Sequence, residues 1–189
     1  AVIAVARDAD GVTVSAALEA IAAVLPHLPI FGYCGTGAHE GEALRELAQA
    51  GVHELVFREV DDMPGVLRAK LKEGEEACAA AAVLAAVHLI LPPALQPIAK
   101  YVVRFPCESH SVVRVAATLS VHRKTLTNWC TRAHAPRPSA VITWCRLLLA
   151  AELLQSPGRS IERISNELEF ASSSAFRNLC KRYIGLTPT

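Results

Sequence analysis

The chain has 189 residues, of which 52% are hydrophobic and 20% charged, a composition that excludes a disordered protein and leaves room for two small domains. Its net charge of +1 conceals an asymmetry, because residues 1–91 carry 6 Lys and Arg against 13 Asp and Glu, whereas residues 92–189 carry 13 against 5. The resulting net charges of −7 and +8 favour two modules, the second of which suits a polyanionic partner.

Cysteine spacing and hydropathy indicate the cellular compartment of the protein. Neither a Cys-x-x-Cys pair nor a zinc-like His spacing occurs among the six cysteines, Cys34, Cys78, Cys107, Cys130, Cys145 and Cys180. We therefore expect a reduced, cytoplasmic protein with no metal and no cofactor. The apolar stretch 77–91 contains His88 and ends at Pro92-Pro93, so it is too short to cross a bilayer comfortably, and no membrane partner is expected.

The first 73 residues alternate strand-like and helix-like segments. Three apolar runs are typical of strands: residues 1–6, 28–33 and 52–57. The first, AVIAVA, is continuous, as in strands covered on both faces, and the chain opens in it without a Met, so we expect a preceding segment. A helix follows it, with an apolar face at Val14, Leu18, Ile21 and Leu25. A second helix ends at Gly51, and a third begins near Pro64. This order predicts an α/β domain with a small parallel sheet.

The rest of the chain is predicted to be helical. Residues 74–91 form an Ala-rich linking helix that Pro92-Pro93 ends. Further helices are expected at about 94–104, 111–118, 122–133, 138–155, 160–168 and 172–183. The predicted organisation is thus an α/β domain over residues 1–73, a linking helix over 74–91 and an all-α domain over 92–189.

A weak internal repeat lies in the all-α domain. Its first copy contains Val115, Ala116, Leu126 and Cys130, and its second contains Ile164, Ser165, Phe176 and Cys180. The first two positions are offset by 49 residues and the last two by 50, so the second copy has one extra residue in its turn. Because the last two positions are spaced i and i+4, they share a buried stripe on one helix. Each copy therefore predicts a helix-turn-helix unit.

The buried stripe fixes which side chains point outward on the second helix of each unit. These are Arg123, Lys124, Thr127 and Asn128 in the first, and Ser173, Ser174, Arg177 and Asn178 in the second. Arg and Lys donate to guanine, Asn pairs with adenine, and Ser or Thr contact either bases or phosphates. Such faces also occur on ordinary solvated helices. Two such polar faces at equivalent places in a basic segment favour binding in the DNA major groove.

Three segments of residues 92–189 follow a known pattern: VAATLSVHRKTLTNWC, WCRLLLAAELLQSPGRS and above all IERISNELEFASSSAFRNLCKRYIGLTP. Through them this part of the chain resembles the DNA-binding domain of the AraC-type transcription regulators. It implies two recognition helices, held by the 138–155 helix, that enter successive major grooves on one DNA face. It also implies phosphate contacts, for which the candidates are His122, Arg137, Ser172, Lys181 and Arg182.

Several positions depart from the family pattern. Ser120 and Glu169 stand where Gly is usual, so each is strained if its φ is positive, and Glu169 adds a negative charge near the DNA. His122 stands where Ser or Thr is usual, and Cys130 and Cys180 stand where Phe is common.

Residues 1–73 resemble, less specifically, the later portion of a response-regulator receiver domain. HLPIFGYCG resembles its fourth strand and ELAQAGVHELVFREV the approach to its fifth. Phosphotransfer would need an Asp, a Ser or Thr, and a Lys at successive strand ends, but the nearest residues are Asp8, Cys34 and Arg58. We expect that Asp8 is not a working phosphoacceptor and that this part packs, dimerises or senses a ligand.

The sequence thus predicts a DNA-binding transcription regulator rather than an enzyme. Its expected partner is double-stranded DNA; RNA polymerase and a second copy of the chain, bound through residues 1–73 or the 74–91 helix, are further candidates. One alternative is a helix-turn-helix fold that has lost DNA affinity and binds protein. Another is a small enzyme using Cys34 as nucleophile with His27 or His39 as base, for which no orienting group or oxyanion loop is evident.

Overall fold

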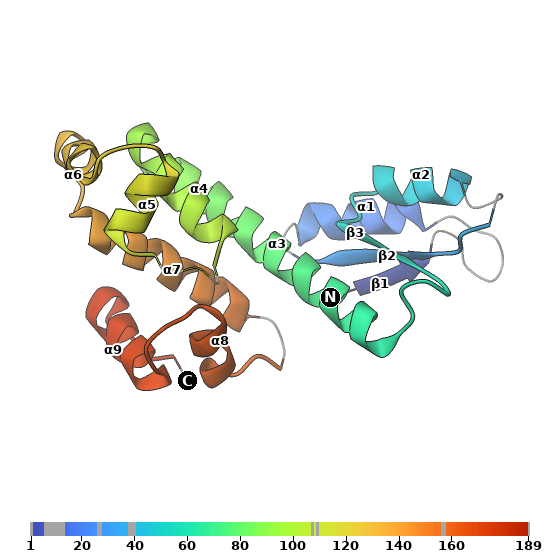
Figure 1. The fold of residues 1–189 in the computed structure, drawn as a ribbon. Helices are drawn as coiled ribbons and strands as arrows, with labels where there is room; N and C mark the ends of the chain where they lie inside the picture. The colour runs from blue at the N-terminus through green and yellow to red at the C-terminus, as the bar shows by residue number, and fades with distance from the viewer. Residues whose placement is uncertain are drawn as a thin grey trace. The chain divides into compact units, whose positions relative to one another are not determined.

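The chain is described here from a computed structural model that covers residues 2–5, 14–25, 28–37, 41–106, 108, 110–155 and 158–188 (Figure 1). Two compact units emerge, Ala1–Ala79 and Ala80–Thr189. Because residues 80–91 contain no Lys, Arg, Asp or Glu, the units keep the net charges of −7 and +8. Asp8, His27 and His39 lie outside the described residues.

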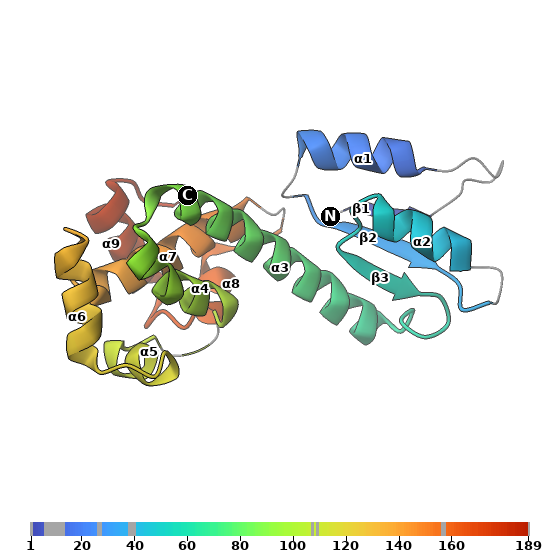
Figure 2. The same cartoon turned by 90° about the horizontal axis from the view of Figure 1, so that it is seen from above.

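A single long helix, α3 (Pro64–Ile90), runs through the boundary between the units (Figure 2). The sequence predicted two helices here, one from Pro64 and one over residues 74–91, and the structure joins them without a break. Most of the intervening residues are strong helix formers, so they outweigh the roughly 1 kcal/mol that Gly74 costs in a helix interior.

The first unit confirms the predicted parallel sheet. Its strands are β1 (Val2–Val5), β2 (Ile30–Cys34) and β3 (Glu54–Phe57), parallel and in that spatial order. Helices α1 (Ser15–Val24) and α2 (Gly41–Gln49) cover one face (Figure 1). There Leu18, Ile30 and Leu47 form part of a common core. On the other face α3 packs so closely on Phe31 that a Cβ at position 74 would lie 2.5 Å from the ring, which explains the glycine.

Two expectations for this unit are wrong. Ile3 and Val5 are 54% and 43% exposed, so the first strand is not covered on both faces. The reason is that α3 packs on β2 and β3, where Lys70 donates to the Leu55 carbonyl at 2.9 Å. Leu25 is 53% exposed because α1 ends one residue before it.

The second unit is helical and is built around α7 (Pro138–Leu154). The other elements are a 3-10 turn η1 (Pro93–Leu95), α4 (Gln96–Arg104), α5 (Val112–Thr118), α6 (Arg123–Arg132), α8 (Ile161–Glu167) and α9 (Ser173–Ile184). Figure 1 places α6 and α9 on opposite sides of α7. Pro138 lies in the first turn of α7, as predicted, where its missing N–H removes no helical hydrogen bond.

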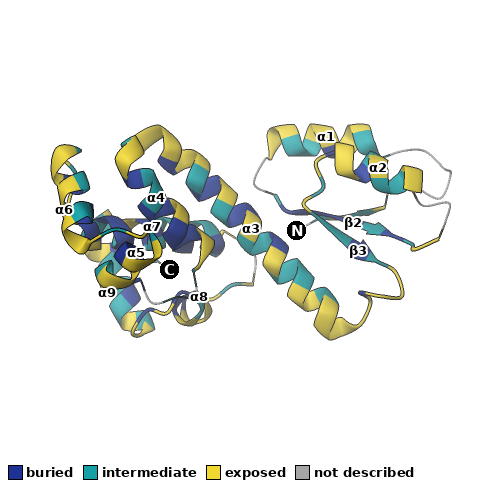
Figure 3. Ribbon diagram, turned by 45° about the horizontal axis from the view of Figure 1, so that its top comes forward, coloured by how far each residue is buried: buried dark blue, intermediate teal, exposed yellow. Residues whose placement is uncertain are grey.

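Burial within the second unit follows this arrangement. Figure 3 shows α7 largely buried, whereas α6 is exposed along its outer side. Ile98 of α4, Leu126 of α6, Ile164 of α8 and Phe176 of α9 are at most 1% exposed. Within the described residues, no helix is long and apolar enough to span a bilayer.

Candidate nucleic-acid interface

The turn of the first helix-turn-helix unit, α5–α6, is set by the way α5 ends. Ser120 has φ +54°, and the N–H groups of Val121 and Ser120 donate to the carbonyls of Ala116 and Ala117 at 2.9 and 3.0 Å. This paired pattern is the Schellman motif, in which one residue adopts the left-handed conformation that glycine tolerates best. The positive φ is the condition under which the sequence analysis expected Ser120 to be strained.

The second unit, α8–α9, repeats the same turn 49 residues later. Glu169 has φ +51°, and the N–H groups of Phe170 and Glu169 donate to the carbonyls of Ser165 and Asn166 at 2.9 and 3.1 Å. The extra residue predicted for this turn is Ala171, which stands between Phe170 and the start of α9. Backbone hydrogen bonding, and not glycine, therefore defines both turns.

The second helix of each unit begins at a capping side chain. His122 Nδ1 accepts from the Lys124 N–H at 3.2 Å, and Ser172 Oγ accepts from the Ala175 N–H at 3.0 Å. Both residues were predicted to contact phosphate. Their place is suitable, because a helix N-terminus presents N–H groups to an anion. The contact itself stays a prediction.

The outward faces lie where the repeat predicted them. On α6, Arg123, Lys124, Thr127 and Asn128 are all exposed, whereas Leu126 and Cys130 are buried. On α9, Ser174 and Asn178 are exposed, Ser173 and Arg177 are half-buried, and Phe176 and Cys180 are buried. Each unit thus presents one polar face opposite its packed stripe.

Arg177 differs from the other residues of these faces because it contacts a side chain of the preceding helix. Its Nη2 lies 3.1 Å from Oε1 of Glu162, in the first turn of α8. The contact joins the two helices of the second unit. Glu162 was not predicted from the sequence; its only signal is that the equivalent position 49 residues earlier is Val113, an uncharged residue.

Arg146 of α7 is a second residue that sequence reasoning missed. Its Nη2 donates to the carbonyls of Leu168 and Glu169, the second at 3.0 Å, and its guanidinium lies 4.2 Å from the centre of the Phe170 ring. It therefore ties the left-handed turn of the second unit to the central helix. Burial lowers the pKa of Arg146, and the charge of Glu169 opposes this shift. A lone Arg inside the apolar run WCRLLLAA was the available signal.

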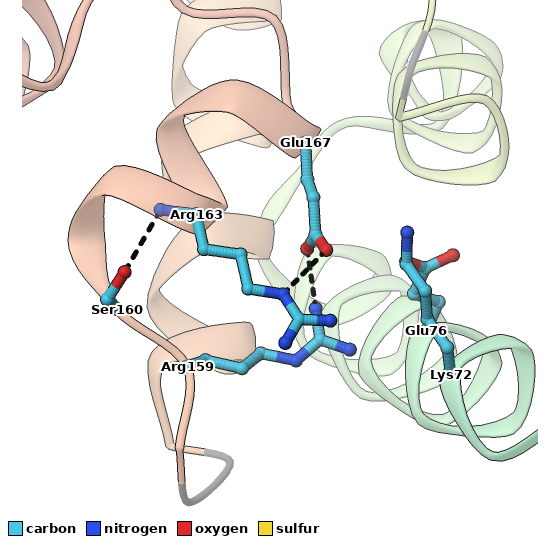
Figure 4. A network of polar contacts seen from close by, with 6 residues as sticks. All are labelled: Lys72, Glu76, Arg159, Ser160, Arg163 and Glu167. Atoms are coloured by element: carbon cyan, nitrogen blue, oxygen red, sulfur yellow. Dashed lines mark hydrogen bonds and ion pairs between the residues drawn. The ribbon is translucent and has the colours of Figure 1, made fainter. Parts of the chain in front are cut away.

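Charged contacts also hold α8 itself, as Figure 4 shows. Arg159 and Arg163 both contact the Glu167 carboxylate, at 2.8 and 3.0 Å. Ser160 Oγ accepts from the Arg163 N–H at 3.2 Å, which confirms the predicted cap of this helix. The first helix of the second unit is thus fixed at both ends.

The part of the chain that contains these two helix-turn-helix units matches a known family. Residues 115–189 match the family model of a helix-turn-helix domain. The C-terminal part of this chain is an AraC-type helix-turn-helix domain. Such a domain implies DNA-binding transcription regulation.

Other comparisons are weaker. No curated protein matches the chain. One solved structure that it resembles is full-length FixJ from B. japonicum, with 16% identity and a TM-score of 0.36, covering 82% of this chain and 74% of that one. Since that score is too low to support a conclusion, the parallel sheet of the first unit is established by its own strand pairing.

The cysteines of the AraC-type domain serve its packing. Burial raises the pKa values of Cys130 and Cys180, and that of Cys145 to about 12, so these thiols are protonated at neutral pH. They fill buried positions as small apolar groups. Next to Cys180, the core is completed by Phe170 and Phe176, whose ring centres are 4.8 Å apart.

The remaining candidate phosphate contacts are surface cations of the AraC-type domain. Arg137 is exposed at the N-cap of α7, and Lys181 and Arg182 are exposed in the last turn of α9. The guanidinium of Arg182 lies 5.9 Å from the centre of the Tyr183 ring. Their roles on DNA stay predictions.

The strand ends of the first unit contain the residues considered for phosphotransfer and catalysis. Cys34 is 4% exposed, and its Sγ lies 3.9 Å from the Val56 carbonyl. Arg58 lies over the Tyr33 ring at 5.7 Å. Within the described residues, no group of three or more His, Cys, Asp or Glu could hold a metal. Since Asp8 is not described, the expectation that it does not accept phosphate stays a prediction.

Proposed function

We propose that this chain is a sequence-specific transcription regulator that places α6 and α9 in successive major grooves of duplex DNA. The observation that carries the proposal is the repeated geometry: two turns with the same hydrogen bonds, each followed by a helix with a polar outward face, on opposite sides of α7. In a helix-turn-helix unit the second helix reads base edges while the first lies across the backbone.

The two faces carry different chemistry. The α6 face has two exposed cations, Arg123 and Lys124, and the amide of Asn128. The α9 face has two hydroxyls, one amide and Arg177. Arg reads guanine and Asn reads adenine, so both units have the means to discriminate bases. The net charge of +8 supplies the attraction to phosphate that brings the faces to DNA. Such a regulator would act in the cytoplasm, where a bacterial-type chromosome lies.

An alternative is a protein-interaction module that kept the helix-turn-helix fold. The exposed carboxylates of Glu162 and Glu169, in and after α8, favour it, because each repels phosphate. Salt dependence separates the two proposals, since DNA binding releases counterions and weakens steeply as salt rises.

The test is to select bound duplexes from a randomised library with the 189-residue chain, and then to titrate the selected site at several salt concentrations. Arg123→Ala and Arg177→Ala should each relax the preference at a different segment of the site, by about 1–3 kcal/mol. Arg182→Ala should weaken all sequences alike and reduce the salt slope by about one. Arg68→Ala, an exposed change in the acidic unit, is the matched control and should alter neither. Selection that yields no preferred duplex, or binding without salt dependence, would contradict the proposal.

A further inference from the structure

Glu162 and Arg177 form a charged pair that the first helix-turn-helix unit lacks. The atoms Oε1 and Nη2 lie 3.1 Å apart, and the two side chains are 61% and 40% exposed. The equivalent positions of the first unit, 49 and 50 residues earlier, are Val113 and Thr127. Among the described residues, therefore, a candidate base-reading side chain is bonded to the preceding helix in the second unit and not in the first.

The contact leaves most of the guanidinium available. Arg carries five N–H donors in a planar fork, and within the described residues Arg177 uses one nitrogen on Glu162. The remaining donors are free to reach an acceptor pair such as guanine O6 and N7. A side chain held in one conformation before binding loses less conformational entropy when it binds. The geometry is that of an Arg177 side chain held in an orientation suited to a base edge.

Glu162 is itself held in place. Its pKa is lowered first by a hydrogen bond from its own backbone N–H, and then by Arg177 and by the hydroxyl of Ser160, so the carboxylate is ionised at neutral pH. It also lies at the N-terminal end of α8, where a negative charge is favoured. A fixed carboxylate both orients Arg177 and repels the phosphates that Arg177 would otherwise contact.

We propose that Glu162 is a positioning residue that holds Arg177 for guanine, so that the second unit discriminates a G·C base pair at the expense of general DNA affinity. This inference rests on the proposed function and names the base pair that one of its side chains reads. A repulsive group that penalises the wrong contact is a general means of raising specificity.

The experiment uses the full chain, the selected duplex, and the same duplex with the base pair that Arg177→Ala identifies changed from G·C to A·T. Glu162→Gln should lower the discrimination between these duplexes by about two- to five-fold, the range expected for one exposed ion pair. It should also tighten binding to an unrelated duplex. Glu169→Gln removes the same charge from the same unit and is the matched control: it should tighten both duplexes and leave their ratio unchanged.

A second measurement tests the pair without DNA. In an NMR titration of the carboxyl carbons, Arg177→Ala should raise the pKa of Glu162 toward its ordinary range, whereas Asn178→Ala should leave it in place. If the pKa of Glu162 does not change in Arg177→Ala, the positioning role is overturned. The same holds if the wild type binds and Glu162→Gln discriminates the two duplexes as well as the wild type does. Either result leaves the proposed function in place. A wild type that does not bind duplex DNA overturns the proposed function and this inference with it.

Discussion

In the described part of the chain, side chains from other helices bond to the turn and to the outward face of the second helix-turn-helix unit, whereas no such bond holds those of the first. In the first unit Ser120 adopts φ +54°, and the four polar residues of the α6 face are all exposed. In the second unit Glu169 adopts φ +51°, but Arg146 holds its carbonyl and that of Leu168, and Glu162 holds Arg177. The two turns have the same backbone hydrogen bonds, so the difference lies in side chains that come from outside the turn.

This difference shows how a glycine position can be filled by another residue. A left-handed conformation costs a non-glycine residue about 1–2 kcal/mol, and the surrounding structure must offset that cost. In the second unit Arg146 contributes charge-assisted hydrogen bonds to the same turn. The first unit has no such donor to Leu119 or Ser120 in the described part of the chain, and its turn depends on backbone bonds and packing alone.

Removing the hydrogen bonds of Arg146 should have the largest effect on the free energy of unfolding. Arg146→Met keeps an unbranched side chain but loses the hydrogen bonds to the Leu168 and Glu169 carbonyls, so the free energy of unfolding should fall by about 2–3 kcal/mol. Hydrogen exchange should show the loss of protection in α8 and α9 rather than in α5 and α6. Arg132→Ala, an exposed change at the end of α6, is the control and should leave both patterns alone. Equal loss of protection in the two units would show that Arg146 does not act locally.

Replacing the capping residues should give the next largest effect on the free energy of unfolding. Ser172→Ala removes a preferred capping hydroxyl and should lower the free energy of unfolding by about 1 kcal/mol. His122→Ala should lower it by only a few tenths, because imidazole is not among the preferred capping groups. Urea denaturation of both variants measures the two values. If His122→Ala is the more damaging change, the comparison of the caps is wrong.

Changing the turn residues should give an effect of opposite sign. Ser120→Gly and Glu169→Gly each relieve a positive φ and should raise the free energy of unfolding by about 0.5–1 kcal/mol. Only Glu169→Gly should also tighten DNA binding, because it removes a negative charge from the second unit. Thermal melting and DNA titration of the two variants separate these effects. Ser120→Ala, which keeps the strain, is the control and should not stabilise the fold.

Periodicity and spacing predicted the parts of the fold that are local. The repeat offsets of 49 and 50 residues located both turns, the extra residue Ala171 and the buried stripes, because each follows from positions a few residues apart. Arg146 and Glu162 act across 22 and 15 residues, through contacts that depend on how α7, α8 and α9 pack. Exposure of Ile3 and Val5 was unforeseen for the same reason, since it depends on which strands α3 covers.

Simultaneous binding of both units to one face of the duplex is the central claim, and a spacing series tests it most directly. Successive major grooves lie about 34 Å, or 10 base pairs, apart, so both units can bind one face only if the two halves of the site keep that spacing. Inserting 5 base pairs between the two halves of the selected site turns one half to the opposite face of the DNA. The measured affinity should then fall at least about ten-fold, to that of a duplex with one half scrambled. An affinity unchanged by the insertion would contradict the claim and show that a single unit reads the DNA.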